Sequence, residues 1–176
     1  MWQDERGEAR EVISRDAVTR ELLDSCDIKM TMFHDRQLIL ARSNHGQGTL
    51  SYDVDDHGVS FSFDAPNTVD GDKAVELVRR GDISGCSFAF TTDYADDENV
   101  ERSVVREGAT RKETYTVRHI DGIYDFTLTP DPAYPSTSVE NRELREFLEH
   151  RDDETRRQIG EMRAAASSKI LNHRKI

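Results

Sequence analysis

The sequence predicts a β-rich α+β domain, in which a small closed or nearly closed β-barrel is flanked by two or three helices. Short apolar stretches that alternate with polar residues recur along the chain, and turn-forming residues separate them. Helical periodicity is confined to a few segments. The chain has 176 residues, enough to bury a core. Because 35% of them are hydrophobic and 34% are charged, we expect a small core and a heavily solvated surface.

The chain begins with a polar segment, residues 1–11, which we expect to be frayed. After it, apolar residues recur at helical spacing behind Ser14, a candidate N-cap, and they predict a short helix over about 15–24. Two apolar stretches then predict strands, which the segment His34-Asp35-Arg36 connects. These two strands span 28–33 and 38–41.

The clearest feature in the middle of the chain is a β-hairpin over 50–63. Apolar and polar residues alternate on both sides of Asp55-Asp56-His57-Gly58, which is typical of a turn. A helix with one apolar stripe follows, and either Asp70 or Asp72 is expected to be its N-cap. It ends at Gly81 after two arginines, whose charge favours a helix C-terminus.

Further strands are predicted in the second half of the body. An alternating apolar stretch begins after a predicted glycine turn at Gly85, and a second hairpin surrounds Gly108. The chain must leave the sheet after the strand over 123–129, because the three prolines between 130 and 135 cannot donate to a strand ladder. The strands of the second hairpin span 100–106 and 113–120.

The chain divides by charge into an acidic body, residues 1–138, and a balanced tail, residues 139–176. The tail holds nine Lys and Arg and eight Asp and Glu, which leaves 15 basic and 27 acidic residues in the body. Apolar residues in the tail are sparse and occur at helical spacing. We therefore predict one folded domain over 1–138 and a charged helical C-terminal extension over 139–176.

The composition argues against several classes of partner. A formal net charge of −11 does not suit binding to phosphates, so we expect no nucleic-acid partner. We expect no membrane association and no export, because no stretch is apolar enough to span a membrane or to form a signal peptide. Cys26 and Cys86 fit neither a disulfide framework nor a metal site, which favours a reducing cytoplasm.

Ser87 is the strongest candidate nucleophile. If residues 86–90 form a strand, Ser87 and Ala89 share one face, and the bulkier residues pack into the core on the other. A single hydroxyl would then project from a rigid backbone, as a nucleophile with a neighbouring base requires. The alternative is that Ser87 is only a small strand residue. Cys86 is a rival nucleophile, but alternation turns it toward the core.

A base and an acid are predicted on other strands. His34 ends an apolar strand, where the core can hold the side chain while its ring faces a cleft; the alternative is a structural histidine bonded to a backbone carbonyl. Asp125 lies in an apolar strand, on the face that alternation assigns to Ile123 and Thr127. A carboxylate there is costly unless it is paired, so Asp125 is a candidate to orient a histidine. His119 is the rival for that role. Metal binding by His34 and its neighbour is disfavoured, because adjacent strand residues point apart.

Seven short stretches, taken in order, resemble the prohead (capsid maturation) proteases of tailed phages of the HK97 type. This serine peptidase family is related in fold to the herpesvirus assemblins. The resemblance covers roughly residues 10–138, and its specificity comes from the order and spacing of the stretches rather than from any one of them. The matching stretches are 12–18, Phe33-His34-Asp35 continuing to 42, 48–50, 58–61, 77–83, Gly85-Cys86-Ser87-Phe88-Ala89-Phe90 and Pro132-Ala133-Tyr134-Pro135.

The resemblance implies a serine endopeptidase with an assemblin-like barrel, in which Ser87 is the nucleophile and His34 the general base. The acidic third member falls on Asp125, where the family more often carries glutamate; the herpesvirus relatives use a second histidine, which keeps His119 open. Two departures are that the family usually has one or two strands before Val12, and that Ala89 stands where glycine is common.

The resemblance also implies a partner and a location. The partner is the scaffolding segment of the major capsid protein, cleaved inside the assembled procapsid in the host cytoplasm. The tail is expected to be a packaging extension or one that the enzyme cuts from itself, and the alternative is an ordinary solvated helix. A homo-oligomer is a further expectation, and no cofactor or metal is expected. The alternative function is a non-catalytic capsid-assembly or scaffold-binding protein on the same fold, and a second alternative is a hydrolase that uses Cys86.

Overall fold

The computed structural model describes residues 2–4, 7–108, 110–139 and 157. The chain separates into two compact units, Met1–Val139 and Glu140–Ile176. In the second unit, only Arg157 is described, and it has a helical conformation. The helical extension predicted over 139–176 otherwise lies outside the described residues, so it stays a prediction.

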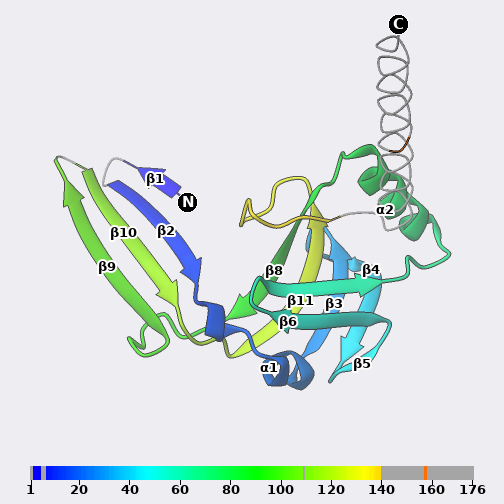
Figure 1. Ribbon diagram of the computed structural model, residues 1–176, viewed down its shortest axis with the longest axis horizontal. Helices are drawn as coiled ribbons and strands as arrows, with labels where there is room; N and C mark the ends of the chain where they lie inside the picture. Colours follow the sequence, from blue (N-terminus) through cyan, green and yellow to red (C-terminus); the bar gives the residue numbers. More distant parts are fainter. Residues whose placement is uncertain (1, 5–6, 109, 140–156, 158–176) are drawn as a thin grey trace, which may run out of the picture. The chain divides into compact units, whose positions relative to one another are not determined.

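A five-stranded sheet forms the centre of the first unit (Figure 1). Two of its inner strands, β3 and β11, run parallel to each other, and every other pair is antiparallel. Most residues of these inner strands are buried, as expected for strands with neighbours on both sides. The strand order is β5 (Gln47–Gly48), β4 (Asp35–Asn44), β3 (Asp27–Met32), β11 (Gly122–Thr129) and β8 (Gly85–Thr91).

The hairpin predicted over 50–63 is confirmed as the pair β6 (Leu50–Asp55) and β7 (Gly58–Phe63). Figure 1 shows it crossing in front of β11 and β3. The ring of Phe61 stacks on the ring of Phe126 in β11, with 5.3 Å between their centroids. The apolar face of the hairpin therefore covers the apolar face of the central sheet.

A four-stranded sheet joins the N-terminal strands to the second hairpin. Its strand order is β1 (Trp2–Asp4), β2 (Gly7–Ile13), β10 (Thr110–Val117) and β9 (Val100–Glu107). The second hairpin is confirmed as β9 and β10, and β2 runs parallel to β10. The prediction of a frayed start is wrong, because residues 1–11 contain β1 and most of β2. They are held by backbone pairing to a strand about 100 residues away.

Two helices and a short 3₁₀ turn accompany the sheets. The turn spans Arg15–Ala17, α1 spans Arg20–Ser25, and α2 spans Val69–Arg80. Thr19 caps α1 and Thr68 caps α2, each through a side-chain oxygen that accepts a backbone N–H. The prediction of Asp70 or Asp72 as the α2 cap is wrong, since both lie in its first turn.

The core lies between the central sheet, the β6–β7 hairpin and the helices. The predicted β-rich α+β class is confirmed, whereas no closed barrel is detected among the described residues and the barrel stays a prediction. None of the described helices is long and apolar enough to cross a membrane. The buried hydrophobic residues are Ala17, Leu23, Ile28, Met30, Met32, Leu40, Ala41, Leu50, Tyr52, Ala74, Ile83, Val100, Val117, Ile120, Ile123, Phe126 and Leu128.

Candidate active site

The candidate site is built on a two-residue turn between β3 and β4. Met32 pairs with Asp35 across the turn, so Phe33 and His34 are its central residues. Both have a φ of 58°, a left-handed conformation that costs a residue with a side chain about 1–2 kcal/mol. Hairpin turns with two positive φ angles favour Asn and Gly instead. Such strain persists only where surrounding contacts impose it, and it is concentrated at functional sites.

Two hydrogen bonds fix this turn to β11. The Phe33 N–H donates to the Leu128 carbonyl over 3.0 Å, which extends the parallel pairing of β3 with β11. The His34 N–H donates to the Thr127 hydroxyl oxygen over 2.8 Å. The second bond holds the backbone of His34 at the face of the sheet from which the Thr127 side chain projects.

On that face, the ring of His34 meets the carboxylate of Asp125. Its Nδ1 lies 2.8 Å from Asp125 Oδ1. The carboxylate side chain is 6% exposed and the imidazole 43% exposed, so the acid lies on the inner side of the pair and the ring on the outer side. A neutral imidazole that donates from Nδ1 to a carboxylate keeps its lone pair on Nε2, the arrangement required of a base.

Ser87 lies on the same face of the sheet. Its direct cross-strand partner in β11 is Thr127, and directly opposed residues project to the same side. Asp125 shares that side, because it precedes Thr127 by two residues in the same strand. Thr31 of β3 is the partner of Thr127 on its other flank. The fold thus brings the three predicted site residues, Ser87, His34 and Asp125, around Thr127.

The hydroxyl of Ser87 forms no hydrogen bond with another residue of the part of the chain that the structure describes. The residue is 6% exposed, so little of its surface is accessible to a substrate. Thr127 itself was not predicted as part of the site. The sequence offers one indication of its role. Thr127 is a polar residue in an apolar strand, two positions after Asp125 and so on the same face.

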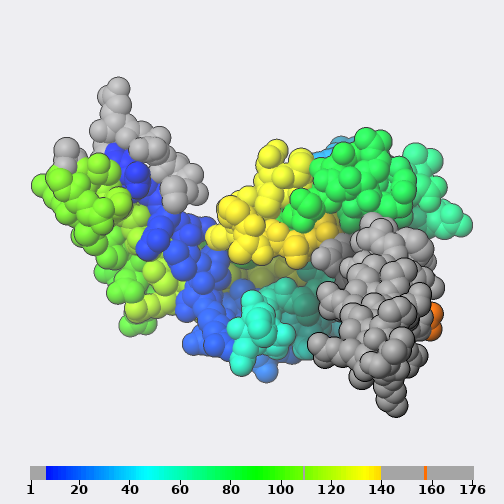
Figure 2. Space-filling model, turned by 45° about the horizontal axis from the view of Figure 1, so that its top comes forward, coloured from blue at the N-terminus to red at the C-terminus, as the bar shows by residue number. Residues whose placement is uncertain are grey.

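The proline-rich segment that follows β11 packs along the outer edge of β8. The Thr137 hydroxyl donates to the Cys86 carbonyl over 2.5 Å, and the Val139 N–H donates to the Ser84 carbonyl over 3.0 Å. Figure 2 shows this segment in yellow at the molecular surface. The ring of Tyr134 stacks on that of Phe88 with 5.6 Å between centroids. The strand that carries Ser87 is therefore held on both of its edges.

Gly85 is required by the packing of this segment rather than by a turn. The structure places it at the first position of β8, with no positive φ, so the predicted glycine turn is wrong there. A Cβ at this position would lie 2.7 Å from Cγ of Pro132, much closer than van der Waals contact. Glycine therefore allows the ring of Pro132 to pack against position 85, which precedes Ser87 by two residues.

Cys86 is a poor candidate for a nucleophile. Burial raises the pKa of its thiol, although a hydrogen bond to Thr137 opposes the shift. A thiol whose pKa is raised contains little thiolate at neutral pH. Its Sγ also lies 3.8 Å from the carbonyl oxygen of Ser138, to which it donates.

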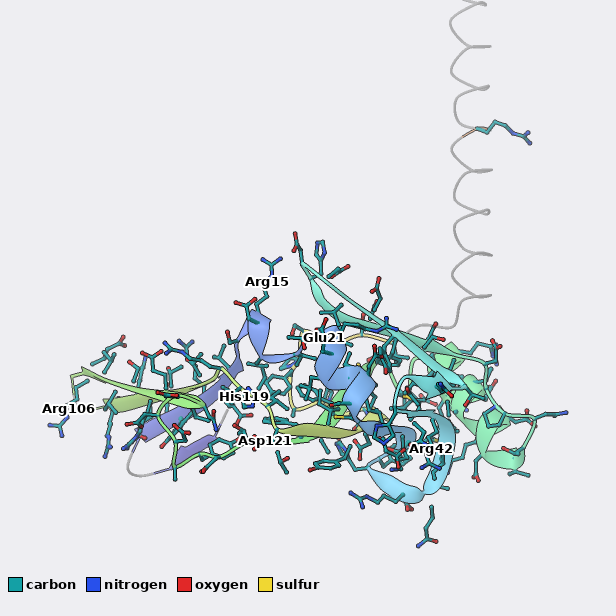
Figure 3. The ribbon with its side chains drawn as sticks, turned by 90° about the horizontal axis from the view of Figure 1, so that it is seen from below. Arg15, Glu21, Arg42, Arg106, His119 and Asp121 are labelled. Atoms are coloured by element: carbon teal, nitrogen blue, oxygen red, sulfur yellow. The ribbon has the colours of Figure 1, made fainter. Side chains whose placement is uncertain are left out.

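His119, the rival third member, contacts Asp121, whereas the ring of His34 contacts Asp125. It follows the end of β10, its ring is 63% exposed, and Nε2 is 3.7 Å from Asp121 Oδ1. Figure 3 shows His119 beside Asp121, and Arg42 well away from both. The Arg42 guanidinium forms two hydrogen bonds with the carboxylate of Asp27, of 2.7 and 2.8 Å.

Among the described residues, no group of three or more His, Cys, Asp or Glu could hold a metal ion.

Comparison with known proteins gives one family match. A family model described as caudovirus prohead serine protease matches residues 1–151 of the 176. No curated protein matches the chain significantly, and no solved structure does. The matched range contains β1 to β11 and therefore all the residues of the candidate site.

Proposed function

Because the chain belongs to the caudovirus prohead serine protease family, we propose that it is a serine endopeptidase that uses Ser87, His34 and Asp125. The family itself carries the coarser statement, a serine peptidase with a role in capsid maturation. The observation that supports the assignment of residues is the 2.8 Å bond between His34 and Asp125, on the face from which Ser87 also projects.

In the proposed reaction, His34 Nε2 takes the proton of the Ser87 hydroxyl as the oxygen attacks a peptide carbonyl. The tetrahedral intermediate collapses when the imidazolium gives that proton to the leaving amine, and an acyl-enzyme remains. Water, deprotonated by the same ring, then releases the acid product and restores the hydroxyl. Asp125 keeps Nδ1 protonated and stabilises the imidazolium that forms in both steps.

The proposed substrate is the scaffolding segment of the major capsid protein, cut inside the assembled procapsid in the host cytoplasm. The resemblance described above supports this substrate and cleavage of the enzyme's own tail, and a homo-oligomer is part of the same proposal. The assemblin-like barrel belongs to the same proposal. No cofactor or metal takes part in the proposed reaction.

Co-expression with the major capsid protein of the same phage tests the proposal. We expect the chain to shorten the capsid protein at a fixed site, and Ser87→Ala to abolish the shortening while assembly continues. Cys86→Ala is the matched control, because it removes the neighbouring nucleophile from the same strand. Processing at the parental rate by Ser87→Ala would contradict the assignment of Ser87, whereas absence of processing by the parent chain would favour the non-catalytic assembly protein.

A further inference from the structure

The strained turn that carries His34 depends on a contact that lies outside the proposed triad. Phe33 and His34 both have a φ of 58°, which is uncommon for a residue with a side chain, although histidine adopts it more often than phenylalanine does. The backbone N–H of Phe33 continues the sheet pairing through Leu128. The N–H of His34 has a side chain as its acceptor, the hydroxyl of Thr127.

We propose that Thr127 is a positioning residue, which holds the backbone of His34 so that its ring stays on Asp125. This inference rests on the proposed function. Thr127 is fully buried, so water does not compete for its hydroxyl. It precedes Leu128, the other anchor of the turn, and it is the direct cross-strand partner of Ser87. One side chain therefore links the backbone of the base to the strand of the acid and lies beside the nucleophile.

Without the hydroxyl, the His34 N–H would have no acceptor, and the strained turn would keep only the bond from Phe33. The turn would then be free to relax toward negative φ, which would carry the imidazole away from Asp125. A displacement of about 1 Å of a reacting group costs on the order of 10²-fold in rate. The affinity for a substrate or inhibitor that binds elsewhere in the site would change much less.

The chain contains a matched control for this contact. Thr31 is the partner of Thr127 in β3, is equally buried, and has the same chemical side chain. Its hydroxyl is the one buried side-chain polar atom of the described residues that has no hydrogen-bond partner. Replacement of either threonine by valine removes one buried hydroxyl and keeps the shape. Only the change at position 127 removes an acceptor of the His34 backbone.

The test compares Thr127→Val, Thr127→Ser and Thr31→Val in the full chain. The probe is a fluorophosphonate, and the readouts are the maximal rate of Ser87 labelling and the probe's half-saturation concentration. We expect Thr127→Val to lower the maximal rate of labelling about 10- to 100-fold. The half-saturation concentration of the probe should stay within about twofold of the parent's value. Thr127→Ser, which keeps the hydroxyl, should recover most of the rate. Thr31→Val should label within about twofold of the parent.

A second measurement separates positioning from general destabilisation. The Nδ1 proton that His34 shares with Asp125 is expected to give a low-field NMR signal in the parent, Thr31→Val and Thr127→Ser, and to weaken in folded Thr127→Val. Labelling at the parental rate by Thr127→Val, an unchanged low-field signal in that variant, or equal losses in both valine variants would overturn the inference. Failure of the parent itself to be labelled at Ser87 would instead count against the proposed function, and the NMR comparison would still decide the role of Thr127.

Discussion

The Nδ1 of His34 lies 2.8 Å from Oδ1 of Asp125, although 91 residues separate the two in the chain. The contact forms because β3 and β11 are parallel neighbours. The turn that follows β3 therefore lies against β11, the strand that carries the acid. The acid is nearly buried and the ring is partly exposed. Such an arrangement orients the ring while leaving its other nitrogen accessible.

Replacement of Asp125 separates the two candidate third members. Asp125→Asn keeps the shape of the side chain but favours the wrong tautomer of His34, so we expect Ser87 labelling to slow by on the order of 10³- to 10⁴-fold. His119→Gln and Asp121→Asn should stay within about twofold, because both side chains are more than half exposed and their 3.7 Å contact is with each other. A large loss in His119→Gln with little change in Asp125→Asn would reverse the assignment.

The thiol of Cys86 should be nearly inert at neutral pH. Burial raises its pKa. The reactive thiolate therefore forms at a higher pH than that of an ordinary thiol, whose pKa is about 8.5. We expect iodoacetamide to alkylate Cys86 slowly at pH 7, with a rate that keeps rising above pH 9, as followed by mass analysis of the modified peptide. Rapid alkylation at pH 7 that also abolishes activity would support the rival cysteine hydrolase.

A methyl group at Gly85 should disturb the packing of the proline-rich segment against β8. Its Cβ would lie 2.7 Å from Cγ of Pro132, so Gly85→Ala should lower the free energy of unfolding by about 1–3 kcal/mol. The double variant Gly85→Ala with Pro132→Ala removes the colliding ring atoms and should recover part of the loss. Denaturant unfolding of the single and double variants measures both effects. Additive losses would show that the two side chains do not collide.

The tyrosines that contact Glu11 should make the domain sensitive to alkali. Tyr134 donates to Glu11 Oε1 over 2.5 Å, and Tyr94 donates to the other carboxylate oxygen. Burial and the Glu11 carboxylate raise the pKa of Tyr134, and they raise the pKa of Tyr94 to about 12. Since an unfolded tyrosine ionises near pH 10, this contribution to stability is intact below that pH. It is lost as the pH rises from about 10 toward the folded-state values.

Unfolding free energies measured between pH 9 and pH 12 check this expectation. The decline should be shallower in the double variant Tyr94→Phe with Tyr134→Phe than in the parent. Tyr124→Phe is the control, because the Tyr124 hydroxyl contacts Thr91 instead of Glu11. Equal slopes in the parent and the double variant would contradict the coupling.

Local patterns in the sequence predict those elements whose neighbours in space are also neighbours in sequence. The hairpin over 50–63 is an example, because its turn and its alternation are both local. The strand β2 is not, since residues 7–11 are mostly charged and the strand is held by β10, about 100 residues later. The same limit applies to Thr127, whose role arises only where the turn at His34 meets β11.

The register of β11 shows a further limit. Strict alternation assigns Ile123 to the face of Asp125, and this prediction is wrong. A one-residue irregularity at Tyr124 pairs Ile123 with Phe90 and Asp125 with Ala89. A bulge of this kind inserts a residue without a signal in a single sequence. Alternation still places Asp125 and Thr127 on one face, because both residues follow the irregularity.

The most direct test of the proposed triad is the identity of the residue that a fluorophosphonate modifies. We predict that mass mapping of the full chain finds one adduct, on Ser87. The adduct should be absent in Ser87→Ala, and its formation should slow at least about 10³-fold in His34→Ala but not in His119→Ala. An adduct on another residue, or labelling of Ser87 that proceeds unchanged without His34, would contradict the proposed triad.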